Sequence, residues 1–288
     1  MKLARNVHND ARPPVWYGAA VLLVAILALA GIFTLQSGQA ATYAVTAEAE
    51  AGNRTGATSA GPAAGASSGA SVRFGAATPR KLKIMPLGDS ITDGFNAYPG
   101  AYRPALWKKL VTTDGYELDY VGSLRNGDSS LPDKDHDGHS GWRIDEINGS
   151  IGGWLNTYDP DVILLHIGTN DIFQDASASV MTSRLDTLLN TIFSRKPDVT
   201  ILVASLIPLR DNGTWNGQVW QQFNQSVPGT VNKYKNQGRE VIFVDMATRS
   251  GLTQGSPDLP DGVHPSASGH AKMADVWYPA VKPLFSAP

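Results

Sequence analysis

Apolar stretches alternate with amphipathic stretches from residue 81 to the end of the chain. The apolar runs have the length of strands and end at Gly, Pro or polar residues, which is typical of parallel strands covered on both faces. They predict five strands, at Leu82–Leu87, Leu118–Val121, Val162–Ile167, Thr200–Leu206 and Glu240–Val244. Helical periodicity predicts helices at Arg103–Thr113, Ile144–Leu155, Ser179–Arg195, Val219–Asn236 and Ser266–Leu284. An interruption is expected at Pro228, and a kink or a split at Pro279.

This alternation of strands and helices is typical of an α/β fold. Because crossovers between parallel strands are right-handed, the helices are expected on both faces of the sheet. The pattern therefore predicts a three-layer α/β/α sandwich with a central five-stranded parallel sheet. Residues 122–141 are polar and are predicted to form a long loop, while the periodicity leaves the strand order open.

The amino-terminal residues contain an apolar span. Val15–Leu35 carries no charged residue and has the length that crosses a bilayer, and basic residues precede it. Positive charge before such a span predicts that the chain after it is exported. Residues 1–40 are thus either a signal peptide, cleaved after a small-x-small site at Gly38-Gln39-Ala40, or a retained membrane anchor. Both alternatives predict an extracellular protein, secreted or anchored to the outer face of the cell membrane.

Residues 41–80 are predicted to be a flexible linker rich in Ala, Gly, Ser and Thr. Within Thr55–Pro79, 22 of 25 residues are Gly, Ala, Ser, Thr or Pro, which bury too little apolar surface to offset the entropy of ordering. The folded domain is therefore expected to comprise residues 81–288.

Charge and cysteine content exclude several classes of function. The 24 basic and 26 acidic residues give a net charge of −2, so there is no basic excess to bind nucleic acid. The chain has no cysteine, which excludes disulfides, thiolate catalysis and Cys-ligated zinc.

An acidic repeat lies in the predicted loop. Asp133, Asp135 and Asp137 before Gly138 match the start of an EF-hand calcium loop, but position 12 is Ile144 instead of the bidentate Glu. We therefore favour a solvated acidic loop over a calcium site, and expect no metal or organic cofactor.

Polar residues follow the predicted strands where each one ends. Asp89 and Ser90 follow the first strand, Asn170 follows the third, and Asp261 and His264 follow the fifth. Because the carboxyl ends of parallel strands meet at one edge of the sheet, these residues are expected to lie close together.

Four short segments, in order along the domain, resemble the conserved blocks of the SGNH hydrolases, the GDSL-type esterases and lipases. The segments are Gly88-Asp89-Ser90, Gly141, Gly168-Thr169-Asn170-Asp171 and Asp261-x-x-His264. The sequences around Gly141 and His264 are most similar to carbohydrate esterase family 3 acetylxylan esterases. The resemblance implies a flavodoxin-like strand order, 2-1-3-4-5, for the sheet.

Ser90, His264 and Asp261 suit a catalytic triad. A serine hydroxyl needs a base that accepts its proton during attack, and imidazole titrates close to neutrality. Asp261 lies three residues before His264 in a turn bounded by prolines, where its carboxylate can reach the imidazole Nδ1–H. The alternative is a polar turn with a surface histidine; a serine and an asparagine at the same edge favour the triad.

Attack on an ester carbonyl places negative charge on oxygen, which donors must stabilise. We expect the oxyanion hole to comprise the Asn170 side-chain amide and the backbone N–H groups of Gly141 and Ser90. Asp89 and Thr169 are predicted to support these loops through hydrogen bonds.

Trp142 and Trp215 are candidate substrate contacts, although each could instead pack in the core. The leading hypothesis is an exported serine esterase, expected to be monomeric, that removes small acyl groups, chiefly acetyl, from polysaccharide such as xylan. The alternatives are a lipase, lysophospholipase or thioesterase of the same superfamily, and a non-catalytic carbohydrate-binding module at the cell surface. The acylated carbohydrate is the expected partner, with the amino-terminal span as the candidate membrane tether.

Overall fold

The computed structural model describes residues 58–62, 70–74, 81–94, 98–209, 215–253 and 257–285. The chain divides into two units, Met1–Gly75 and Ala76–Pro288. In the first, β1 (Thr58–Pro62) pairs antiparallel with β2 (Ala70–Phe74), within the stretch predicted as a linker. The predicted signal peptide or anchor, with the span Val15–Leu35, lies outside the described residues. None of the helices in the described ranges is long and apolar enough to cross a membrane.

The second unit has the predicted α/β fold, built on a sheet that is mostly parallel. Its strands are β3 (Leu82–Gly88), β4 (Leu118–Tyr120), β5 (Leu124–Arg125), β6 (Asp135–Gly138), β7 (Val162–His166), β8 (Thr200–Ala204) and β9 (Val241–Val244). The five predicted strands correspond to β4-β3-β7-β8-β9 in spatial order. This is the flavodoxin-like order 2-1-3-4-5, as the family resemblance implies.

The prediction of five strands is wrong in one respect, because the sheet has seven. The two additional strands, β5 and β6, lie in the stretch predicted as a polar loop. β4 pairs with the first half of β3, at residues 82–84, and β6 pairs with its last two residues. β6 therefore occupies the edge of β3 that the short β4 leaves open, next to the end that carries Ser90, and β5 pairs antiparallel with β6.

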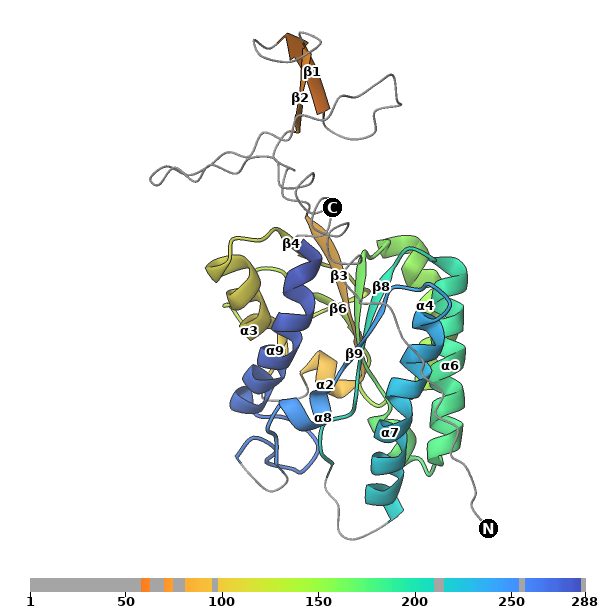
Figure 1. The fold of residues 1–288 in the computed structure, drawn as a ribbon. Coiled ribbons are helices and arrows are strands. Elements are labelled where there is room, and N and C mark those ends of the chain that lie inside the picture. Colours follow the sequence, from red (N-terminus) through yellow and green to blue (C-terminus); the bar gives the residue numbers. More distant parts are fainter. Residues whose placement is uncertain are drawn as a thin grey trace, which may run out of the picture. The chain divides into compact units, whose positions relative to one another are not determined.

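Helices cover both faces of this sheet, as Figure 1 shows. One layer is α4 (Ile144–Tyr158), α6 (Ala178–Arg195) and α7 (Trp215–Lys235), and the other is α3 (Arg103–Trp107) and α9 (Ala267–Val281). Alternate strand residues enter the two cores. On β7, Ile163 and Leu165 pack beneath the first layer, and Val162 and Leu164 beneath the second.

α7 continues through Pro228, where an interruption is expected, and α9 is not split at Pro279. α7 includes Pro228, and α9 includes Pro279 before ending in the short 3-10 helix η2 (Lys282–Phe285). α7 buries Val227 and Val231 on either side of its proline, so packing on the sheet outweighs the lost backbone hydrogen bond. α3 is followed by a turn of π-helix, η1 (Lys108–Thr113).

Three further short helices follow strands at their carboxyl ends. α2 (Ser90–Asp93) follows β3, α5 (Thr169–Phe173) follows β7, and α8 (Met246–Arg249) follows β9. α2 and α5 carry Ser90 and Asn170, so the fold delivers both residues to one edge of the sheet.

Candidate active site

Ser90 is the first residue of α2, immediately beyond β3. Asp89 is the N-cap of this helix, and its Oδ1 accepts a hydrogen bond from the Ile91 N–H at 2.9 Å. Gly88 lies so close to β7 that a Cβ atom there would be 2.2 Å from the carbonyl oxygen of His166. The backbone N–H of Ser90 lies in the first turn of the helix, where amides have no intrahelical acceptor. Ser90 is therefore fixed by its neighbours, with a backbone donor beside its hydroxyl.

Ser90, His264 and Asp261 form a continuous chain of hydrogen bonds. Ser90 Oγ lies 2.9 Å from His264 Nε2, and His264 Nδ1 lies 2.7 Å from Asp261 Oδ2. With a proton on Nδ1 donated to Asp261, Nε2 is the atom that accepts the Ser90 hydroxyl proton. The structure thus brings the three predicted residues together in the order that acyl transfer requires.

The second oxygen of Asp261 holds the turn itself. Asp261 Oδ1 accepts the backbone N–H groups of Val263 at 2.9 Å and His264 at 2.7 Å. Burial alone would raise the pKa of Asp261, but the hydrogen bonds from His264 and Val263 outweigh it and hold that pKa below its usual value. Asp261 therefore remains an anion that orients the imidazole.

Gly141 lies in a turn that is hydrogen-bonded to Gly88, two residues before Ser90, and to Asn170. The turn is attached to the end of β3 by the hydrogen bond from His139 N–H to Gly88 O, at 2.9 Å. On its other side, Asn170 Nδ2 donates to Trp142 O at 3.0 Å. Gly141 has φ +85, and a Cβ atom there would meet nothing within 4 Å, so this position requires glycine for its backbone conformation.

Asp89 and Thr169, predicted as supports, are both buried. Burial raises the pKa of Asp89 to about 7, against the opposing effect of the Ile91 N–H and the Thr169 hydroxyl. Asp89 thus supports Ser90 as the N-cap of α2. Because Asp89 is buried, ionisation of its carboxyl group costs free energy.

Trp142 packs in an aromatic stack beside the Gly141 turn. The His139, Trp142 and Trp154 rings are all near-parallel neighbours: the His139 centroid lies 4.4 Å from Trp142 and 4.6 Å from Trp154, and the two tryptophan centroids lie 6.1 Å apart. One face of Trp142 is therefore occupied within the protein, which favours the packing interpretation for that face. The side chain of Trp215 lies outside the described part of the structure.

The three aspartates of the suspected calcium loop have separate partners. Asp133 accepts the Tyr120 N–H at 2.7 Å, and Asp135 pairs with Arg125 at 3.0 Å. Asp137 is fully buried on β6, where it accepts from Ser123, so the prediction of a solvated loop is wrong for this residue. Within the described ranges no group of three or more His, Cys, Asp or Glu side chains is placed to hold a metal ion.

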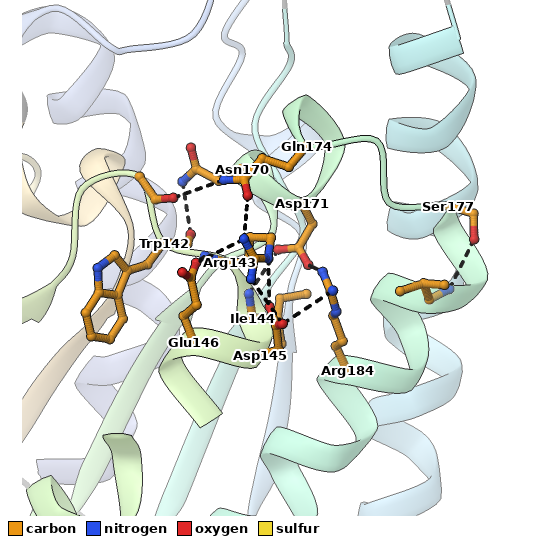
Figure 2. A network of polar contacts seen from close by, with 12 residues as sticks. Trp142, Arg143, Ile144, Asp145, Glu146, Asn170, Asp171, Gln174, Ser177 and Arg184 are labelled. Atoms are coloured by element: carbon orange, nitrogen blue, oxygen red, sulfur yellow. Dashed lines mark hydrogen bonds and ion pairs between the residues drawn. The ribbon is translucent and has the colours of Figure 1, made fainter. Parts of the chain in front are cut away.

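The sequence did not reveal the polar network beside Asn170 and Trp142, which Figure 2 shows. Asp171 is fully buried, and it bonds to the backbone of Ile144 and to Arg184 of α6. Its one sequence signal is its place directly after Asn170, and nothing in the pattern of α6 marks Arg184.

Taken with the strand order, this edge defines the class of protein: an SGNH hydrolase, the superfamily of GDSL-type esterases and lipases. The sequence profile of the GDSL-like Lipase/Acylhydrolase family matches residues 87–272, and the chain belongs to this family. The match includes all four segments that carried the resemblance.

Solved structures of carbohydrate esterases are similar to this chain. A Clostridium thermocellum family 3 carbohydrate esterase is 39% identical with a TM-score of 0.63, covering 72% of this chain and 98% of that one. A carbohydrate esterase family 3 structure from Talaromyces cellulolyticus is 28% identical with a TM-score of 0.62, covering 71% and 98%.

A curated relative is also an esterase by name. The Multidomain esterase of Ruminococcus flavefaciens is 34% identical over 221 residues, which are 68% of this chain and 28% of that protein. This chain therefore matches about a quarter of that relative's length. Family and neighbours together place the chain among the esterases of the GDSL superfamily.

Proposed function

We propose that the protein is a serine esterase that removes small acyl groups, chiefly acetyl, from polysaccharide such as xylan. The observation that carries the proposal is the hydrogen-bonded chain Ser90 Oγ, His264 Nε2, His264 Nδ1 and Asp261 Oδ2. A carbohydrate-binding module requires no such chain, whereas acyl transfer uses each of its members.

In the proposed mechanism, Ser90 Oγ attacks the ester carbonyl carbon while His264 Nε2 takes its proton. The carbonyl oxygen becomes an anion that accepts hydrogen bonds from Ser90 N–H, Gly141 N–H and Asn170 Nδ2. His264 then gives the proton to the departing sugar oxygen, leaving an acyl group on Ser90. Water, deprotonated by His264, attacks this acyl-enzyme; the acid is released and Ser90 regains its proton. The reaction needs no metal or organic cofactor.

Similarity to the family 3 carbohydrate esterases supports a carbohydrate substrate. A third solved structure, a mutant acetyl esterase with an acetate ion, is 28% identical with a TM-score of 0.61 and supports acetyl as the acyl group. The predicted export of the chain fits a substrate too large to enter a cell, and secretion or anchoring at the outer face of the membrane is part of the proposal.

Acetate release from acetylated xylan, compared with other acetylated glycans, tests the substrate. We expect acetate release from xylan by the wild-type enzyme and none by Ser90→Ala. A series of p-nitrophenyl esters tests the acyl group: kcat/KM should fall from acetyl to octanoyl. A preference for octanoyl would support a lipase, lysophospholipase or thioesterase instead, and a Ser90 that resists a phosphonate label would support a binding module.

A further inference from the structure

We propose that Asp171, held by Arg184, is a positioning residue that fixes the Gly141 turn and Asn170 relative to each other, and so sets the geometry of the oxyanion hole. The inference rests on the proposed esterase function. It assigns to the buried Asp171–Arg184 pair a role in the rate of acyl transfer, beyond its part in folding.

The Asp171 carboxylate lies between two elements, the start of α4 and the side chain of Arg184 on α6. Asp171 Oδ2 accepts the backbone N–H of Ile144, the first residue of α4, at 2.9 Å. Asp171 Oδ1 accepts from Arg184 Nη1 at 2.6 Å. Figure 2 shows the carboxylate between the start of α4 and the Arg184 side chain. One buried side chain on α5 therefore joins α4 to α6.

Two carboxylates accept the first amides of α4: Glu146 of the helix itself accepts the Arg143 N–H at 2.8 Å, and Asp171 accepts the Ile144 N–H. The N-cap of α4 is Arg143, whose side chain has no acceptor atom for the amides of the first turn. Asp171 supplies one from another element, and its negative charge also interacts favourably with the amino-terminal end of a 15-residue helix. Gly141 lies three residues before Ile144, so fixing the start of α4 fixes the end of the Gly141 turn.

Asn170 and Gln174, on the same short helix or just after it, contact the remainder of that turn. Asn170 Nδ2 donates to Trp142 O at 3.0 Å, and Gln174 Nε2 donates to Gly141 O at 3.4 Å. α5 and the segment from Gly141 to Ile144 thus move as one unit. Asp171 is the charged, fully buried member of this set, which makes its contact the one whose loss costs most.

Arg184 keeps the carboxylate usable as an acceptor. A buried carboxylate is costly unless it is paired, and Arg184 is its paired cation. Arg184 also contacts Asp145 at 3.3 Å, and Asp145 pairs with Arg143 at 3.0 Å. The cluster of two arginines and two aspartates connects α6 to the residues on either side of the start of α4.

The test compares Asp171→Asn with the wild type on p-nitrophenyl acetate. Asn keeps the size and one acceptor but loses the charge that binds Arg184. Because a misplacement of about 1 Å can cost about 100-fold in rate, we expect kcat to fall about 10- to 100-fold while KM changes less than about twofold. The matched control is Asp186→Asn, which removes a carboxylate from the same helix as Arg184, paired with Lys233 at 2.6 Å, and should leave kcat unchanged.

Two arginine variants separate positioning from folding. Arg184→Met should lower kcat as Asp171→Asn does, and Arg184→Lys, which keeps a cation, should restore part of the loss. These variants also serve if Asp171→Asn does not fold. A normal kcat with a lowered Tm in the folded variants would overturn the proposal, because a structural role alone reduces stability and not the turnover of folded enzyme. Ser90→Ala, measured alongside, tests the esterase function itself: if it keeps wild-type activity, the proposed function fails regardless of Asp171.

Discussion

Ser90 Oγ lies 2.9 Å from His264 Nε2, although the two residues are 174 positions apart in the chain. Ser90 follows the central strand β3, and His264 lies in the turn before α9, the helix that packs with α3 over one face of the sheet. The contact therefore depends on the whole α/β fold. Substitution of either Ser90 or His264 would remove it and so tests the proposed chemistry.

Replacing Asp261 by Asn should impair catalysis more than stability. The new side chain can still accept the backbone N–H groups of the turn through its carbonyl oxygen, but its amide cannot serve as the anion that holds the Nδ1–H tautomer. We expect kcat to fall by about 10²- to 10⁴-fold, in line with the effect of the same change in other triads. Steady-state kinetics on p-nitrophenyl acetate, with Tm as the folding control, measures this. A variant with wild-type kcat would show that Asp261 does not orient His264.

The Asn170 side chain is predicted to act in the transition state. Asn170→Ala removes one oxyanion donor and should cost about 2.7–4 kcal/mol, or about 10²- to 10³-fold in kcat, with little change in KM. Asn170→Asp, of equal size but without the amide donor, should be at least as impaired. An unchanged kcat in Asn170→Ala would remove this residue from the oxyanion hole.

Two glycines should respond differently to substitution by alanine. At Gly88 the new Cβ would meet the backbone oxygen of His166, so we expect a loss of about 1–3 kcal/mol in the free energy of unfolding as β3 and β7 shift apart. At Gly141 the Cβ meets open space, and the cost is the left-handed backbone alone, about 1 kcal/mol. Urea unfolding of Gly88→Ala and Gly141→Ala measures the two losses in the free energy of unfolding. Equal losses would contradict the prediction that the Gly88 variant loses more.

Asp89 should make stability depend on pH. Its pKa in the folded protein is about 7 against an ordinary 3.8, so between these values the folded state binds more protons than the unfolded state. The free energy of unfolding therefore falls as pH rises through this window. Asp89→Asn does not titrate, and relative to the wild type it should gain on the order of 4 kcal/mol between pH 4 and pH 8. Urea unfolding at both pH values measures the difference, and a pH-independent difference would contradict the raised pKa.

The sequence predicts the strands whose burial is visible as hydrophobicity. β7, with its continuous apolar run, is found within one residue of its predicted range. β6 was missed because three of its four residues are Asp135, His136 and Asp137. His136 and Asp137 are buried all the same, with polar partners that include the Gly138 N–H for His136 and Ser123 for Asp137. A polar strand such as β6 is stabilised by partners elsewhere in the fold. The pattern of hydrophobic residues does not reveal those partners.

The candidate site also contains features that the sequence predicts and features that it does not. Ser90, Asn170 and His264 are predictable because each is a reactive or polar residue placed after a strand, at an edge where such residues meet. The contact between Asp171 and Ile144 is not predictable, because one partner is a backbone N–H that any residue would offer. Positioning groups of this kind become visible when the helices are placed in space, whereas the roles of the predicted catalytic residues stay predictions until they are measured.

The turnover of Ser90→Ala on p-nitrophenyl acetate tests the central claim most directly. The variant removes one oxygen, at a position where alanine fits the first turn of α2, so folding should be retained and is checked by Tm. We predict a fall in kcat of at least about 10⁴-fold, because Ser90 Oγ is the nucleophile of the proposed mechanism and alanine cannot form the acyl-enzyme. Hydrolysis at the wild-type rate by folded Ser90→Ala would contradict it.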